Sequence, residues 1–224
     1  MAESSGFSEF LTYLSERAHD PDRGESLPPL SGLSEEMDIS VSRLREQLEV
    51  AKALGFVDVR PRVGIRQLPY RFAPTVRQSL FYAIRQDHKY FEEFLDLRRH
   101  IEYAYLEQAM AALTPEDEET LEALLNKAWD KLQGRPVRIP HEEHRKFHLT
   151  IFRRLDNTFV NGLLEAYWDA YEAVGLDVYA DMAYLQEVWT YHQQLAASLI
   201  SGEGDRARQL LKEHFDLLID RLAS

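Results

Sequence analysis

Apolar residues recur every three or four positions along most of this 224-residue chain, a period that predicts amphipathic helices. Near the N-terminus the pattern predicts helices over 7–18 and 33–37, and a third from Val41 to Gly55 with Ser40 as its cap. Beyond Pro74 it predicts helices near 75–88, 90–112, 115–132, 141–155, 158–173, 178–200 and 205–222. The chain is therefore expected to be mainly α-helical.

The period changes to two between Phe56 and Leu68, where apolar and polar residues alternate around a Pro-Arg-Val-Gly turn. Such alternation predicts a two-stranded hairpin. The order helix, helix, tight turn, helix, hairpin is that of a winged helix-turn-helix, whose second helix of the pair enters the major groove of DNA. The alternative is a small α/β subdomain that does not bind nucleic acid. We expect a winged-helix DNA-binding domain over 1–70 and, over 71–224, an all-helical antiparallel bundle of six to seven helices, with the boundary near 69–75.

Charge is unevenly distributed along the chain. The formal net charge of −12 argues by itself against binding to nucleic acid. Residues 39–71 nevertheless carry seven basic and three acidic side chains, and DNA affinity depends on a local basic face. The alternative is an ordinary fluctuation in surface charge. The expected DNA contacts lie early in the recognition helix and in the hairpin: Ser40, Ser42, Arg43, Arg45, Arg62 and Gly64.

The composition excludes several classes of protein. The chain has no Cys, which excludes disulfides and thiol catalysis. No apolar run approaches the roughly 18 residues that span a bilayer. The first 30 residues lack the pattern of a secretion signal. We therefore expect a cytoplasmic protein with no membrane partner.

Four of the eight histidines occupy the apolar, inward-facing stripes of three predicted helices. They are His144 and His148 on the helix at 141–155, His192 on the helix at 178–200, and His214 on the last helix. A buried imidazole needs partners for its ring nitrogens, and convergence of several on one divalent metal would supply them. The alternative is a set of hydrogen-bonded core histidines. His141 has suitable spacing but lies at a helix start, which makes it a weaker candidate.

Two sets of segments resemble one family of proteins. LPPLSGLSEEMDISVSRLREQLEVAKALGFVDVRPRVGIRQLP resembles the winged-helix domain of GntR-family regulators, with Arg45 at the arginine of their "VRE" motif and Val41 where an arginine is common. LDLRRHIEYAYLEQA, HRKFHLTIFRRLDNTF and YHQQLAASLISGEGDRARQLLKEHF resemble the FCD effector domain of the FadR-type branch. The resemblance covers nearly the whole chain. It implies a homodimeric transcription regulator, a repressor or an activator, that binds operator DNA and a small organic acid such as a sugar acid.

The FCD resemblance also implies a divalent metal held by one Asp and three His. In the stretch that carries the Asp and the first His, this chain reads His144-Arg-Lys-Phe-His148, so His144 replaces the Asp. His192 and His214 match the other two ligands. An all-imidazole set favours zinc or nickel over manganese, which prefers oxygen.

Two further residues match positions near the effector in the family. Arg98 and Asn157 are those residues, and Arg98 would receive the carboxylate of an organic acid. The alternative for Arg98 is a surface ion pair. Two alternatives also stay open for the histidines, a purely structural metal or the catalytic metal of an enzyme. A hydrolytic site needs a general base, and Glu143 is expected to point away from His144 and His148 by helical phase.

Overall fold

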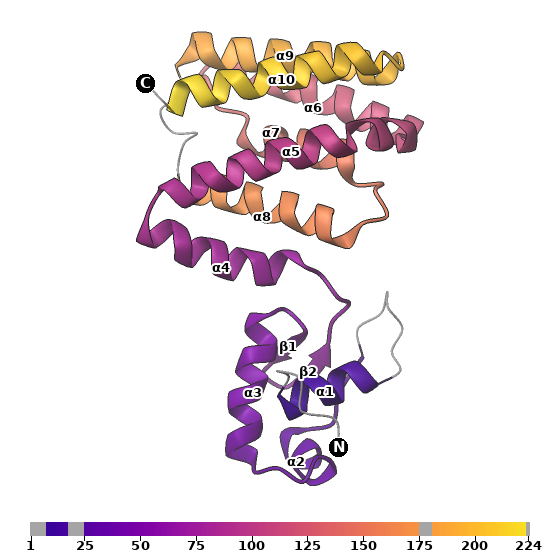
Figure 1. Ribbon diagram of the computed structural model, residues 1–224, viewed down its shortest axis with the longest axis vertical. Helices are drawn as coiled ribbons and strands as arrows, with labels where there is room; N and C mark the ends of the chain where they lie inside the picture. Colours follow the sequence, from indigo (N-terminus) through magenta and orange to yellow (C-terminus); the bar gives the residue numbers. More distant parts are fainter. Residues whose placement is uncertain (1–7, 18–24, 175–180, 223–224) are drawn as a thin grey trace. The chain divides into compact units, whose positions relative to one another are not determined.

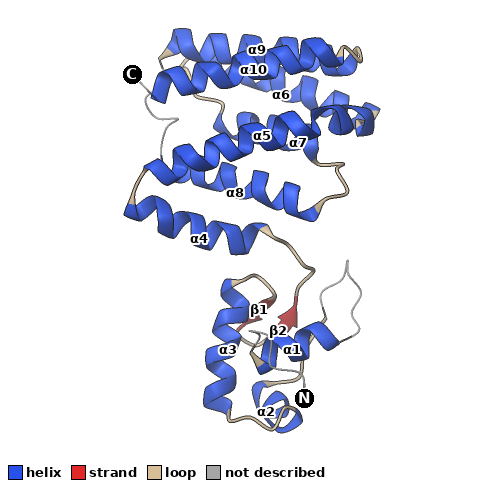
Figure 2. Cartoon of the chain, in the orientation of Figure 1, coloured by secondary structure: helices blue, strands red, loops and turns tan. Residues whose placement is uncertain are grey.

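Helices dominate the computed structural model, which describes residues 8–17, 25–174 and 181–222 (Figures 1 and 2). The mainly α-helical fold predicted from the sequence is confirmed. Residues 7 and 18 of the first predicted helix, and 178–180 of another, lie outside the described residues. The chain divides into two compact units, 1–79 and 80–224, and the division falls within α4 (Ala73–Gln86). Among the described helices, none is both long and apolar enough to cross a membrane.

The N-terminal unit contains a helix-turn-helix followed by a hairpin. Its elements are α1 (Glu9–Glu16), α2 (Leu30–Glu36), α3 (Val41–Ala53), β1 (Val57–Arg60) and β2 (Gly64–Gln67). One apolar cluster joins them, because each helix turns its apolar stripe inward; its buried members include Phe10, Leu14, Leu33, Leu44, Leu48, Val57 and Ile65. Burial of this stripe fixes the direction of α3 and leaves its polar face exposed.

Both ends of α3 follow from local chemistry. The Ser40 hydroxyl accepts a hydrogen bond from the backbone N–H of Arg43 at 3.3 Å, so Ser40 is the N-cap that the sequence predicts. At the other end, the backbone N–H of Phe56 donates to the carbonyl of Ala51 at 2.9 Å. This turn requires a φ of +79° at Gly55, a conformation that favours glycine.

The hairpin pairs β1 with β2 in antiparallel register, with Val57 opposite Gln67 and Arg60 opposite Gly64. The sequence predicts a plain loop before α2, but Ser26 forms a β-bridge with Arg66 there. Backbone hydrogen bonds at 2.9 and 2.7 Å join the neighbouring residues to β2. β2 is therefore paired along both of its edges, with β1 on one side and residues 25–27 on the other, which stabilises the hairpin.

The C-terminal unit is a helical bundle. Its helices are α5 (Lys89–Ala112), α6 (Pro115–Gln133), α7 (His141–Phe152), α8 (Thr158–Val174), α9 (Met182–Ile200) and α10 (Gly204–Leu222), together with the end of α4. Helices α9 and α10 run side by side, and α6 packs against both α7 and α9 (Figure 1). Thr114 and Asp117 cap α6 reciprocally, as the Thr-Pro start predicts.

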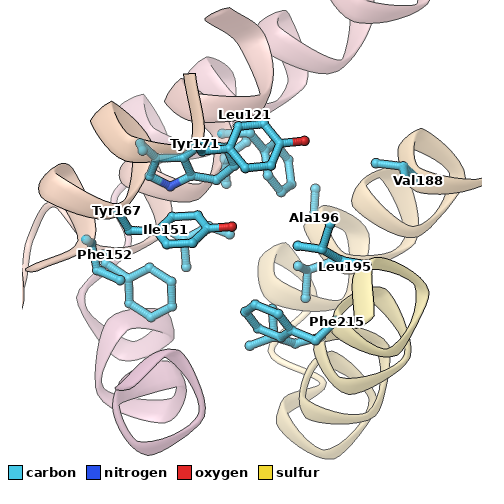
Figure 3. Packing of buried hydrophobic residues seen from close by; sticks show 14 of the residues in the cluster. Leu121, Ile151, Phe152, Tyr167, Tyr171, Val188, Leu195, Ala196 and Phe215 are labelled. Atoms are coloured by element: carbon cyan, nitrogen blue, oxygen red, sulfur yellow. The ribbon is translucent and has the colours of Figure 1, made fainter. Parts of the chain in front are cut away.

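The core of the bundle is apolar and aromatic. Figure 3 shows Ile151 and Tyr167 on one side of this core, opposite Leu195 and Phe215 on the other. The described helix ends differ from the predicted ones by up to four residues; α7, for example, ends at Phe152. The helices thus lie where the periodicity places them, and their inward stripes meet along the middle of the bundle.

Candidate metal centre

Three helices of the bundle bring the four inward histidines together. Helix α7 supplies His144 and His148, which stand one turn apart, while α9 supplies His192 and α10 supplies His214. The last three of these side chains are at most 5% exposed. Among the described residues, these four form the group that can hold a metal ion, and His141 is not part of it.

The distances between the ring nitrogens fit a shared cation. One nitrogen from each of the four rings lies within 4.8 Å of the others. Nε2 of His148 and Nε2 of His192 approach to 3.0 Å. Metal–nitrogen bonds of about 2.0–2.1 Å separate neighbouring ligands by about 2.9 Å in octahedral and about 3.4 Å in tetrahedral geometry. The closest pair already has such a separation, whereas the widest pair would have to move closer together to share the same ion.

All four imidazoles are held in their neutral form. Burial is the largest cause that lowers the pKa of each ring well below 6.5, and the nearby guanidinium of Arg98 lowers all four further. The rings also lower one another's pKa, because a proton on one repels a proton on the next. A neutral imidazole is the form that offers a lone pair to a metal.

Several ring nitrogens lack any other partner. Nε2 of His144, Nδ1 of His192 and Nδ1 of His214 are buried without a hydrogen bond. A hydrogen-bonded core histidine satisfies its nitrogens, and each buried polar atom left without a partner costs about 1–3 kcal/mol. These rings are therefore not satisfied by hydrogen bonds, which argues against the alternative of ordinary core histidines.

A buried ion pair lies behind His148. Nε of Arg98 donates to Oε1 of Glu102 at 2.6 Å, and Oε2 of Glu102 lies 3.3 Å from Nδ1 of His148. The Arg98 guanidinium also lies 4.2 Å from the ring centroid of Tyr167. Both charged side chains are at most 2% exposed, so the alternative of a surface ion pair for Arg98 is wrong. Burial raises the pKa of the Glu102 carboxyl, and the Arg98 charge opposes that rise.

Glu102 is the residue that the sequence reasoning missed. A signal for it exists in α5, where Arg98 and Glu102 share the three- and four-residue spacing of the buried Phe91, Leu95 and Leu106. That spacing is compatible with a place in the core for both charges, and it fits a surface ion pair equally well.

Aromatic rings enclose the histidine cluster. The ring of His144 lies 4.7 Å from that of Trp168, and the ring of His192 lies 4.7 Å from that of Phe147 and 4.8 Å from that of Trp189. Among the described residues, a cavity that reaches His144 has a volume of about 20 Å³. A space of that size has room for one water molecule and is too small for an organic acid.

Asn157 and Glu143 have partners away from the cluster. Oδ1 of Asn157 accepts the backbone N–H groups of Phe159 and Val160 at 3.1 Å, which caps the start of α8, and its Nδ2 donates to the hydroxyl of Tyr105 at 3.3 Å. Lys131 donates to Oε2 of Glu143 at 2.6 Å. This pairing agrees with the expectation that Glu143 points away from the histidines.

The candidate DNA contacts of α3 are all exposed. Ser42 and Arg45 stand free of the core in the first two turns, while the hydroxyl of Ser40 caps the helix. Arg43 forms an ion pair with Glu9 of α1, a contact that holds its guanidinium beside the N-terminus of α3. Helix α3 thus presents a polar face with two exposed arginines, of which Arg43 is ion-paired with Glu9.

The hairpin tip presents the remaining two candidates. Arg62 lies in the turn between β1 and β2, and Gly64 begins β2; both are exposed, with φ of +67° and +96°. A positive φ at a non-glycine residue is uncommon, and at Arg62 it belongs to the tight turn that reverses the chain. The tip therefore carries a cationic side chain on a short, exposed turn.

Comparison with known proteins assigns the C-terminal unit to a known domain family. The model of the FCD domain family matches residues 93–217. Among solved structures, Escherichia coli McbR/YncC is 21% identical, with coverage of 97% of this chain and 98% of that chain and a TM-score of 0.51. Streptococcus agalactiae GntR is 17% identical, with coverage of 93% and 94% and a TM-score of 0.68. No curated protein matches the chain by sequence.

These matches agree with the resemblance drawn from the sequence. The family model spans more than half of the chain and includes all four histidines, Arg98 and Glu102. The two solved structures share the fold over nearly the full length, including the helix-turn-helix unit. The chain therefore belongs to the FCD-domain family.

Proposed function

We propose that this protein is a DNA-binding transcription regulator whose C-terminal unit binds a divalent metal through four histidines. The observation that carries the proposal is the convergence of four neutral imidazoles from three helices, three of them buried: His144, His148, His192 and His214. A set of four nitrogen ligands suits zinc or nickel better than oxygen-seeking cations. Such a site ties α7, α9 and α10 to one ion.

For operator binding, α3 would enter the major groove with Ser42 and Arg45 toward the bases, while Arg62 and Gly64 of the hairpin contact DNA beside it. A phosphate would compete with Glu9 for Arg43. A homodimer would present two such helices to successive major grooves about 34 Å apart, on a near-palindromic site. Regulation of transcription would take place in the cytoplasm, as a repressor or an activator.

For regulation, we propose a small organic acid as effector at the metal. Four neutral imidazoles leave both charges of a divalent cation unneutralised, and the charges of Arg98 and Glu102 cancel each other. An anionic further ligand is electrostatically favoured in such a site. Nη2 of Arg98 is buried without a partner and would donate to a carboxylate. The effector would act by preferring one of two dimer arrangements that differ in DNA affinity.

The small cavity supports a second candidate, a regulator whose metal is purely structural. A volume of about 20 Å³ beside His144 admits no organic acid unless the helices separate. Closed four-ligand sites are typical of structural zinc, whereas catalytic zinc keeps an open position. The same four-ligand set supports a regulator over a metal-dependent enzyme.

Elemental analysis and thermal unfolding of the purified chain separate these candidates. One zinc or nickel per chain is expected, and the absence of any stoichiometric metal would overturn the metal site. An effector raises the melting temperature only while the metal is present, whereas a structural metal stabilises the protein with no response to any organic acid. Operator binding is tested by fluorescence anisotropy, with the protein titrated into labelled DNA from upstream of its own gene. Binding without sequence preference, with and without metal, would overturn the proposed role as a transcription regulator.

A further inference from the structure

We propose that Glu102 is a positioning residue for the metal, and that it acts by fixing the tautomer of His148. The inference rests on the proposed metal site. Oε2 of Glu102 lies 3.3 Å from Nδ1 of His148, and both side chains are at most 1% exposed. The Glu102 carboxylate already accepts the Nε–H of Arg98 at Oε1 and offers only acceptor atoms to the ring, so Nδ1 carries the ring proton. The lone pair then sits on Nε2, the atom that faces His192.

His148 differs from the other rings in this support. Nδ1 of His192 and Nδ1 of His214 are buried without a partner, so no hydrogen bond at Nδ1 fixes the tautomer of those rings. Nε2 of His148 lies 3.0 Å from Nε2 of His192. Since Nε2 of His148 accepts in that contact, Nε2 of His192 donates when no metal is bound. The carboxylate thus sets the proton positions of two rings, and His148 is the ring prepared to receive the cation.

Arg98 holds Glu102 in the orientation that this role requires. Its Nε donates to Oε1 at 2.6 Å, which leaves Oε2 for His148. The guanidinium lies 4.2, 4.6 and 4.9 Å from the ring centroids of Tyr167, Trp168 and Phe215, so it cannot swing away without breaking this aromatic packing. Three helices, α5, α8 and α10, therefore fix the carboxylate before a metal arrives.

The tautomer can be read without any metal. Long-range ¹H–¹⁵N spectra of the full chain, labelled on histidine and treated with chelator near pH 7.5, report which ring nitrogen carries the proton; His148→Gln assigns the resonances. We expect the proton of His148 on Nδ1. In Glu102→Gln the amide oxygen stays with Arg98, so the amide NH₂ faces the ring and moves its proton to Nε2. A wild-type His148 protonated on Nε2 would overturn the proposal.

Metal affinity supplies the second readout. Zinc competition with a chromophoric chelator should show binding weaker by about 10- to 100-fold in Glu102→Gln, the usual effect of removing such a carboxylate. The matched control is Glu107→Gln on the same helix, whose side chain is 83% exposed, and its affinity should equal that of the wild type.

A double variant keeps the test decisive if Glu102→Gln fails to fold. Arg98→Met combined with Glu102→Gln removes both buried charges and leaves neither unpaired. It should bind zinc as weakly as the single variant, with a cobalt absorption spectrum changed from that of the wild type. If these variants bind zinc with wild-type affinity, the role of Glu102 is refuted while the metal site itself stands. A wild-type chain that binds no zinc would refute the metal site instead, while the tautomer spectra still decide the role of Glu102.

Discussion

Acid should unfold the metal-free C-terminal unit through its four central histidines. Burial lowers the pKa of these rings well below 6.5 in the folded protein, whereas in the unfolded chain they titrate near 6.5. Below that pH the unfolded chain binds more protons than the folded one. The free energy of unfolding therefore falls as the pH falls below about 6.5, and it is independent of these groups above that pH.

The size of the effect follows from the number of rings. Each group that is neutral in the fold and protonated in the unfolded chain contributes about 1.4 kcal/mol per pH unit. Four such groups give a slope of up to about 5 kcal/mol per pH unit. Because a typical domain is stable by about 5–15 kcal/mol, the unit should unfold within roughly one to three pH units below 6.5.

Tryptophan fluorescence provides the assay. Trp129, Trp168 and Trp189 all belong to the C-terminal unit, so their emission during urea denaturation reports this unit. Measurements between pH 5 and 8 with chelator present should give the steep slope, and His214→Gln should lower it by about 1.4 kcal/mol per pH unit. His100→Gln is the control, since its side chain is 65% exposed. An unfolding free energy that stays constant from pH 7.5 to 5.5 would refute the neutral, buried cluster.

Three further predictions concern DNA and metal binding. Arg45→Ala should weaken operator binding and reduce the salt slope by about one in anisotropy titrations, because Arg45 is exposed and cationic; equal affinity and slope would remove it from the contact. Glu9→Gln should strengthen DNA binding in the same titrations, because it frees Arg43 and removes a negative charge beside the start of α3. Weaker binding would show that Glu9 orients Arg43 instead. His192→Ala should abolish bound metal, measured by elemental analysis, together with any metal-dependent thermal shift; a variant that keeps both would exclude His192 as a ligand.

The histidine cluster could be predicted because helical phase is strongly constrained. His144 and His148 share a face with Phe147 and Ile151, and an amphipathic helix has one direction in which to bury such a face. The same logic applies to His192 and His214 on α9 and α10. The sequence does not contain the distances between these helices, so convergence on one point became visible only in the folded bundle.

Other features depend on contacts between segments that carry no local signal. Ser26 pairs with Arg66 across the hairpin, yet its neighbours read as a loop because the stretch is rich in Gly, Pro and acidic residues. A single bridge needs no alternating pattern, since only a few backbone groups take part. The hydrogen bond from Leu27 N–H to the carbonyl of Ile65 likewise depends on the backbone alone.

The ion pair of Arg98 and Glu102 shows why phase can be ambiguous. Helix α5 carries apolar residues on two adjoining faces, and Leu97 on one of them is 43% exposed while Leu95 on the other is buried. An Arg and a Glu one turn apart therefore fit a surface pair as well as a buried one in sequence. Burial is stable only when donors surround the carboxylate, and here Arg98 and Nδ1 of His148 supply them. His148, the partner that favours burial of this face of α5, thus lies on another helix, 46 residues from Glu102 in the chain.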